Sequence, residues 1–147
     1  MNRFKTLRFV QVVLLTLLSA NVVAAGPEQD LSAGRAAAQL WVAKLDADQF
    51  GECWDLFSSA FKKSNSRWAW NIECRMGRLH LGKARSRKEV SAERTTTSPG
   101  GRTGEFVIIK FATTSEKKGP IFEQVAVQKD VDGQWRVCGY AIGQEQK

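Results

Sequence analysis

The hydrophobic pattern of the chain changes its period about halfway along the sequence. In the first half the apolar residues recur every three to four positions, as on one face of a helix, whereas further on they alternate as in strands. Because helix and strand signals are segregated, the sequence predicts an α+β fold with helices packed on one face of an antiparallel sheet. A length of 147 residues suits one such domain.

The N-terminal segment 1–25 has the features of a secretory signal peptide. Three basic residues and no acid precede an almost unbroken apolar run over residues 9–20. Val23 and Ala25 are small residues at the positions that a signal peptidase recognises before its cleavage site. We expect cleavage after Ala25, a periplasmic or secreted protein, and a single α+β domain over residues 26–147. An uncleaved anchor is the alternative, but the run is shorter than the roughly 20 apolar residues that span a bilayer. No later stretch is apolar enough to span one.

Three helices are predicted in the first half of the mature chain. The first is expected to begin at a cap formed by Asp30 or Ser32 and to end near Leu45. The second is expected over residues 50–61, where Phe and Trp recur at helical spacing in the strongest helix signal of the sequence.

The third predicted helix carries large apolar residues four and three positions apart and ends near Gly77 or Gly82. We expect these residues, Trp68 among them, to form its core-facing stripe. They are Trp68, Ile72, Met76 and Leu79.

Four antiparallel strands are predicted to follow. The first is the polar segment 83–97, which a loop rich in Pro and Gly over residues 98–104 separates from the second. Residues 106–113 are apolar on both faces, as expected of a central strand, and a turn at Asp132 and Gly133 joins the last two strands.

Residues spread over the mature chain carry a resemblance to a known family. They are Trp54, Trp68, Arg78, Gly82, Arg87, Pro99, Gly100, Gly104, Glu105, Phe106, Glu123 and the closing run 132–140. The chain resembles a secreted bacterial family known as the domain of unknown function numbered four thousand and nineteen. The resemblance implies three N-terminal helices on a curled four-stranded sheet, in a cystatin-like or nuclear-transport-factor-like cone, and it implies no reaction or ligand.

Four residues are the candidate ligand-binding set: Arg78, Arg87, Glu123 and Tyr140. In a cone-shaped fold, Arg78 or Arg87 would pair with Glu123 in a cavity between helices and sheet, where a ligand or an acid–base pair would lie. A structural ion pair that braces the sheet is the alternative. Side chains of Glu123, Arg87 and Tyr140 that converge in an open pocket would favour an enzyme, and a closed apolar centre would favour a binding protein.

The three cysteines, Cys53, Cys74 and Cys138, lack the spacing of a redox or zinc motif. In an oxidising compartment we expect a disulfide between Cys53 and Cys74 on adjacent helices, which would stabilise the fold by about 3 kcal/mol. Three buried thiols are the alternative, because cysteine often packs as a small apolar residue.

The segment 75–94 is the most basic stretch of the mature chain. Its charged residues are Arg75, Arg78, Lys83, Arg85, Arg87, Lys88 and Arg94 against Glu89 and Glu93. A solvated strand face accounts for such a run, and an anionic envelope component or lipid head group is the partner class that it would attract. We do not expect nucleic acid as a partner, because a secreted protein seldom meets it.

Together these features predict an envelope protein that acts as a non-enzymatic binding or accessory module, with a small ligand or an anionic component as its partner. The alternative is a small cavity hydrolase or isomerase that uses a carboxylate acid–base pair, Glu123 with Tyr140 or His80. No cofactor loop is evident, and a single histidine excludes a multi-histidine metal site.

Overall fold

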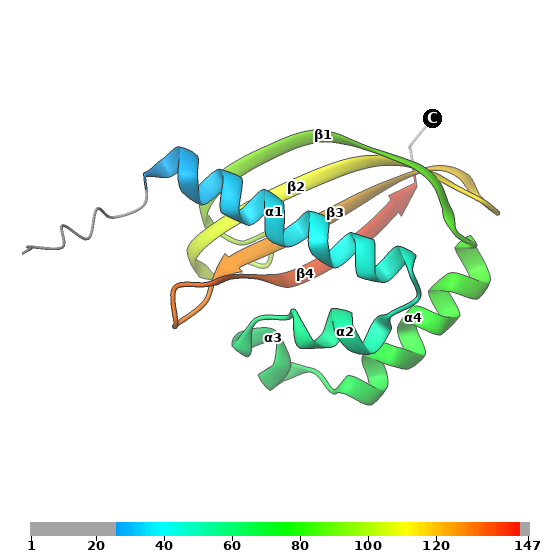
Figure 1. Cartoon of the computed structure of the whole chain (residues 1–147), viewed down its shortest axis with the longest axis horizontal. Coiled ribbons are helices and arrows are strands. Elements are labelled where there is room, and N and C mark those ends of the chain that lie inside the picture. The colour runs from blue at the N-terminus through cyan, green and yellow to red at the C-terminus, as the bar shows by residue number, and fades with distance from the viewer. Residues whose placement is uncertain (1–25, 145–147) are drawn as a thin grey trace, which may run out of the picture.

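The computed structural model describes residues 26–144, so the predicted signal peptide lies outside the described part of the chain. Helices come first and strands follow, in agreement with the predicted α+β class (Figure 1). The elements are α1 Pro27–Asp46, α2 Phe50–Asp55, α3 Ser59–Ser64, α4 Arg67–Leu81, β1 Ala84–Thr97, β2 Thr103–Ser115, β3 Gly119–Lys129 and β4 Trp135–Gln144.

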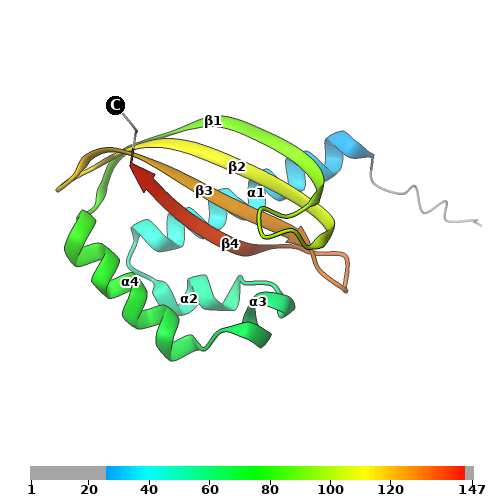
Figure 2. The ribbon, with the colours of Figure 1, turned by 180° about the vertical axis from the view of Figure 1, so that it is seen from behind.

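The four strands form one antiparallel sheet in the order β1-β2-β3-β4, so each strand pairs with its neighbours in sequence. The helices cover one face of this curled, open sheet, and the view from behind shows the other face without a helix over it (Figure 2). The polar segment predicted as the first strand is β1, an edge strand paired only with β2.

The first helix starts earlier than predicted. Gly26 takes the cap position, and Pro27 occupies the first turn, where a missing N–H costs no hydrogen bond. Asp30, a predicted cap, instead lies buried within α1, and its carboxylate pairs with Arg94 at 3.2 Å and Lys129 at 3.3 Å. The ion pairs explain why an acid occupies a buried helical position.

The second predicted helix is wrong in one respect, because residues 50–61 form two short helices. The chain between them runs beside β4, where the Ser58 N–H donates to the Val137 carbonyl at 2.8 Å. The Ser58 hydroxyl accepts the Phe61 N–H at 3.3 Å, and the Asp130 carboxylate accepts the Ser59 N–H at 2.8 Å and its hydroxyl at 2.6 Å. These side chains cap a new helix start in the middle of the apolar stripe.

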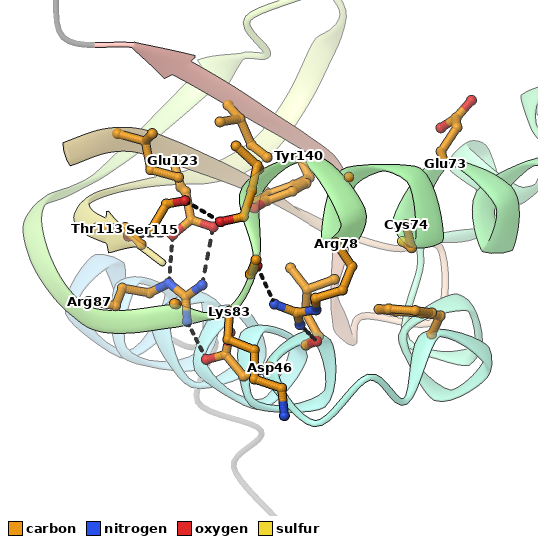
Figure 3. Close-up of a pocket in the computed structure, with 18 of the residues that line it drawn as sticks. Asp46, Glu73, Cys74, Arg78, Lys83, Arg87, Thr113, Ser115, Glu123 and Tyr140 are labelled. Atoms are coloured by element: carbon orange, nitrogen blue, oxygen red, sulfur yellow. Dashed lines mark hydrogen bonds and ion pairs between the residues drawn. The ribbon is translucent and has the colours of Figure 1, made fainter. Parts of the chain in front are cut away.

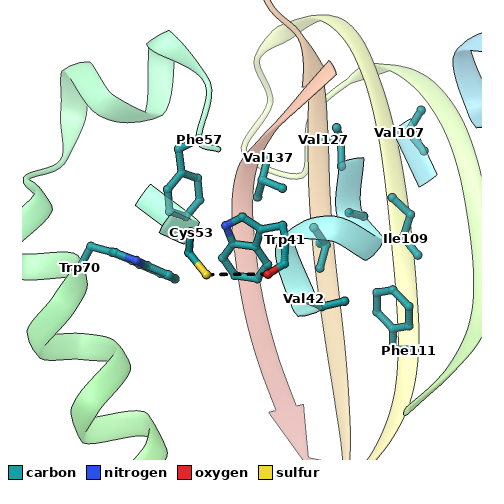
Figure 4. Close-up of a cluster of buried hydrophobic side chains, with 12 residues drawn as sticks. Trp41, Val42, Cys53, Phe57, Trp70, Val107, Ile109, Phe111, Val127 and Val137 are labelled. Atoms are coloured by element: carbon teal, nitrogen blue, oxygen red, sulfur yellow. Dashed lines mark hydrogen bonds between the residues drawn. The ribbon is translucent and has the colours of Figure 1, made fainter. Parts of the chain in front are cut away.

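The hydrophobic core lies between the helices and the sheet, around Trp41 of α1 (Figure 4). The Trp41 ring is fully buried, with its centroid 5.6 Å from Phe57, 5.6 Å from Trp70 and 5.0 Å from Tyr140. The other fully buried apolar side chains of this core, each at 0% exposure, are Ala38, Cys53, Phe57, Val107, Ile109, Val125, Val127 and Val137. α1, α2, β2, β3 and β4 thus share one core.

The third predicted helix is α4, and it ends at Gly82, whose φ of +72° favours glycine. The expectation that Trp68 faces the core is wrong, because its side chain is 75% exposed. The neighbouring Trp70 is the buried one, and its indole N–H donates to the Phe50 carbonyl at 2.9 Å. α4 is therefore rotated so that its predicted core stripe faces outward.

No helix within residues 26–144 is long and apolar enough to cross a membrane.

Candidate functional site

A pocket of about 280 Å³ lies between α4 and the nearby end of the sheet (Figure 3). Much of its wall is apolar, with Leu45, Phe50, Trp70, Leu81 and Ile121 among the lining residues. All four residues of the candidate ligand-binding set also line it: Arg78, Arg87, Glu123 and Tyr140. The structure therefore brings the predicted site residues together around one cavity.

Glu123 stands at the centre of the polar part of this wall. Its side chain is only 3% exposed, and Arg87 donates to both carboxylate oxygens, from Nε to Oε2 at 2.7 Å and from Nη2 to Oε1 at 3.1 Å. The Thr113 hydroxyl donates to Oε2, and the Tyr140 hydroxyl donates to Oε1. Each carboxylate oxygen thus accepts two hydrogen bonds.

The pairing of the strands explains how these four side chains meet. Each strand contributes one of them: Arg87 from β1, Thr113 from β2, Glu123 from β3 and Tyr140 from β4. Arg87 lies directly opposite Thr113, while Glu123 is two residues along β3 from the partner of Thr113 and two from that of Tyr140. Because alternate residues of a strand share a face, all four point toward the helices.

A second acid reaches the same guanidinium from the helical layer. Asp46, the last residue of α1, accepts a hydrogen bond from Arg87 Nη1 at 2.5 Å. The Arg87 side chain, 11% exposed, therefore lies between two carboxylates and links the end of α1 to the sheet.

This arrangement keeps both groups charged. Burial alone would raise the pKa of Glu123, but the hydrogen bonds from Arg87, Thr113 and Tyr140 outweigh it, and the pKa lies below its ordinary value. Burial would lower the pKa of Arg87, but its bonds to Glu123 and Asp46 raise it. Burial and the adjacent Glu123 charge raise the pKa of Tyr140, so its hydroxyl stays protonated and donates.

Arg78 lines the pocket but does not pair with Glu123. Its Nε donates to Asp48 at 2.6 Å, Nη1 to the Gly82 carbonyl at 2.9 Å and Nη2 to the Leu45 carbonyl at 2.7 Å. Of the two arginines proposed as partners of Glu123, Arg87 is the one that pairs with it. Arg78 fastens the end of α4 to the turn after α1.

Sequence reasoning missed three polar partners in the pocket region: Asp46, Asp48 and Thr113. The two acids lie in a segment that reads as an ordinary polar turn. Thr113 has a detectable signal, because it follows Val107, Ile109 and Phe111 at alternating positions that face the core. A polar residue at such a position requires a partner within the fold.

All three cysteines are free thiols in the structure, and Cys74 is the one that lines the pocket. Burial raises the pKa of Cys53 and of Cys74 to about 12, which makes either thiol a weak nucleophile at neutral pH. The disulfide between these two residues stays a prediction.

The basic segment 75–94 does not form a single surface. Arg78 and Arg87 are bound within the pocket wall, and Arg94 pairs with Asp30 and Glu105. Others of its cations are exposed, namely Arg75, Lys83, Arg85 and Lys88.

Within residues 26–144, no group of three or more His, Cys, Asp or Glu side chains is placed to hold a metal ion. The model of one protein family, described as "Protein of unknown function (DUF4019)", matches residues 37–140. That stretch is more than half of the chain and includes every residue of the Glu123 network. No curated protein matches the chain, and no solved structure does.

Proposed function

The chain belongs to the DUF4019 family, whose description names no activity, and we propose from the geometry of the pocket that it is a non-enzymatic binding protein of the bacterial envelope. The pocket between α4 and the sheet would hold a small ligand that is apolar over most of its surface and polar or anionic at one end. The observation that carries this proposal is an apolar pocket with a fully bonded polar network in its wall.

The lining of the pocket supports an amphipathic ligand. Small-molecule sites combine mostly apolar walls with a few fixed polar groups that orient the ligand. Here Trp70, Leu81 and Ile121 supply apolar wall, while the exposed ammonium of Lys83 supplies positive charge at the polar side. The charge of Arg87 is balanced by Glu123 and Asp46. A volume of about 280 Å³ limits the ligand to a small molecule.

The bonding of Glu123 argues for binding in preference to catalysis. A general base needs a free lone pair within reach of substrate and a pKa near the working pH. Both oxygens of Glu123 are occupied by Arg87, Thr113 and Tyr140, and its pKa lies below the ordinary value. The carboxylate therefore suits a fixed electrostatic support for Arg87.

A cavity hydrolase or isomerase is the second candidate, because one observation favours it. Glu123, Arg87 and Tyr140 converge on the wall of a pocket, and a closed apolar centre does not surround them. In such an enzyme a substrate would have to displace at least one of the hydrogen bonds to Glu123 before the carboxylate could accept a proton.

The proposed location in the envelope rests on residues 1–25. A basic start, an apolar run and small residues before Gly26 are the features that export machinery recognises. The proposal therefore includes removal of these residues and action in the periplasm or outside the cell.

Native mass spectrometry of the protein purified from bacterial cells that express the full chain tests the proposal. We expect an added mass that is lost on denaturation. A Gly77→Phe variant should lack it, because Gly77 lines the pocket from α4 and has open space at its Cβ, so a large side chain there is expected to occupy pocket volume. Gly77→Ala is the matched control and should retain the added mass.

The same spectra contain the outcomes that contradict the proposal. If the wild-type protein shows no added mass, or if Gly77→Phe retains it, the pocket is not the binding site that we propose. A polypeptide mass that includes residues 1–25 would overturn the proposed processing and leave the pocket assignment standing.

A further inference from the structure

The outer face of α4 carries four large apolar side chains in a row. The exposed fractions are 75% for Trp68, 43% for Ile72, 60% for Met76 and 67% for Leu79. Spacings of four, four and three residues place them on one side of a helix, and we call this row the α4 outer face. Single exposed apolar residues are ordinary, whereas a contiguous group of them marks a contact surface.

The position of α4 shows why the rest of the fold does not cover this face. The opposite side of the helix, with Trp70, Cys74, Gly77 and Leu81, lines the pocket. α4 lies at the far end of the helical layer from the start of α1, and the sheet and the other helices lie to one side of it (Figure 1). The outer face therefore points away from the described fold.

Positive charge borders the α4 outer face. Arg75 is exposed and lies three residues from Ile72 and four from Leu79, which places it beside both. At the end of the helix, Lys117 of the turn between β2 and β3 donates from Nζ to the Leu79 carbonyl at 2.9 Å, and the exposed Lys118 follows it.

Negative charge lies at two places around this helix. Glu73 is the acidic residue of α4; it lines the pocket but is also exposed, three residues before Met76, so it borders the α4 outer face on the side away from Arg75. Glu116 of the neighbouring turn is directed toward the end of the helix, where its carboxylate accepts the Lys83 N–H at 3.1 Å. The α4 outer face thus combines apolar side chains with a border on which three cations, Arg75, Lys117 and Lys118, outnumber two acids, and an anionic partner would balance the remaining positive charge.

We propose that the α4 outer face docks on a bilayer surface that contains anionic lipids. Apolar side chains of a surface helix enter the boundary between head groups and acyl chains, while flanking cations bind lipid phosphates. Trp68 fits this boundary because its ring is apolar and its N–H is polar. The inference does not depend on a ligand in the pocket.

A second copy of the chain matches this face less well than lipid does. A two-fold contact places the same surface on both sides of the interface, so Arg75, Lys117 and Lys118 of one copy would approach those of the other. Glu73 is the acid of α4 at this border, so the cations would outnumber the acids on both sides of such a contact. Lipid phosphates supply the missing negative charge.

Co-sedimentation with phosphatidylcholine vesicles, with and without phosphatidylglycerol, tests the proposal on the protein that bacteria produce from the full chain. We expect binding to the anionic vesicles that weakens as NaCl is raised. The double variant Met76→Ser/Leu79→Ser should bind about tenfold more weakly, and Arg75→Gln about fivefold more weakly. All variants share one N-terminus, so differences between them report on α4.

Matched controls separate this face from general surface effects. Leu40→Ser removes an apolar side chain of α1 that is 50% exposed, and Arg102→Gln removes an exposed cation from the loop between β1 and β2, at the opposite end of the sheet from Lys117. Both should bind vesicles as the wild type does. All these side chains are exposed, and thermal unfolding of each variant checks that the fold is retained.

Three results would overturn the proposal. The first is a wild-type protein that does not bind anionic vesicles, and the second is a loss of binding that is equal in the controls. The third is a wild-type dimer in sedimentation velocity that Met76→Ser/Leu79→Ser dissociates, which would assign the face to a second copy. Because the pocket is unchanged in these variants, failure here leaves the native-mass test of the pocket unaffected.

Discussion

Glu123 shows how a buried charge is made stable by its neighbours. Its carboxylate would be costly to bury alone, but Arg87, Thr113 and Tyr140 satisfy both of its oxygens. Removing the charge therefore leaves Arg87 partly unpaired inside the fold. The ion pair of Glu123 and Arg87 is part of the pocket wall, and a substitution of either residue leaves the other without this partner.

We predict that Glu123→Gln lowers the free energy of unfolding by about 3 kcal/mol at neutral pH, because it breaks a buried ion pair. The pKa of Glu123 lies below that of an unfolded glutamate, so the unfolded chain binds more protons in acid. The stabilisation is thus present above the unfolded pKa and is lost as the pH falls through the folded pKa. The variant should lose less stability than the wild type over that range, as measured by urea denaturation at several pH values.

A double-mutant cycle is the control for that interpretation. Arg87→Met should also destabilise the fold, and the double variant Arg87→Met/Glu123→Gln should lose clearly less than the two single losses combined. Strict additivity would contradict a direct energetic link between these two side chains.

Two glycines within helices differ in what surrounds them, and replacing each by alanine should therefore change the free energy of unfolding in opposite directions. Gly34 of α1 lies against β2, and a Cβ there would be 2.6 Å from Cγ2 of the fully buried Val107. Gly77 of α4 has open space at the same position. Gly34 permits close packing of α1 on the sheet. Gly77 has no such packing role and makes α4 less stable than alanine would.

We predict that Gly34→Ala lowers the free energy of unfolding by about 1–3 kcal/mol through overpacking. Gly77→Ala should raise it by about 0.5–1 kcal/mol, because alanine favours the helix. Urea denaturation of the two variants measures both values. A stabilising Gly34→Ala would show that α1 can move off the sheet without cost.

Most elements were predictable from the sequence because each has a local signal, such as the alternation in β2 and β3 or the glycine after α4. The division of residues 50–61 was not, because it depends on Asp130, which lies far along the chain and caps Ser59. The rotation of α4 was not predictable either. Both Trp68 and Trp70 lie at plausible helix positions, and packing on Phe50 selects the second.

Across the whole molecule, α4 has fewer neighbours than the central strands. β2 and β3 each pair with a strand on both sides, whereas α4 is joined to the rest of the fold by Trp70 and by hydrogen bonds of Arg78 and Lys117 at its C-terminal end. Stability is therefore expected to be unequal across the fold. The pocket lies between its most and its least constrained parts.

We predict that the amide hydrogens of α4 exchange with solvent faster than those of β2 and β3. Arg78→Gln should accelerate exchange in α4 further, because it removes bonds to Asp48 and Leu45. Arg67→Gln is the matched control, since its ion pair with Asp55 is exposed and such pairs contribute little. If the amide hydrogens of α4 exchange as slowly as those of β2 and β3, the prediction of a less stable α4 is wrong.

Four residues of the candidate site were predictable from the sequence, but three of their polar partners and the contacts between them were not. An acid at position 123 alternates with Ile121 and Val125 toward the core, so a buried partner is required. Which arginine supplies it depends on the register of β1 and on the turn after α1, where Asp48 binds Arg78. Those contacts join residues thirty or more positions apart and have no local pattern.

The contribution of one side chain from every strand to the Glu123 network also bears on folding. A slip by one residue in any strand turns its side chain to the opposite face, and a slip by two moves it about 7 Å along the sheet. In β1, β2 or β4 either error withdraws a donor from Glu123 while the carboxylate remains in an apolar interior. A misaligned sheet that buries just as much apolar surface is therefore expected to be higher in free energy than the native one. The Glu123 network thus favours the native alignment of the strands.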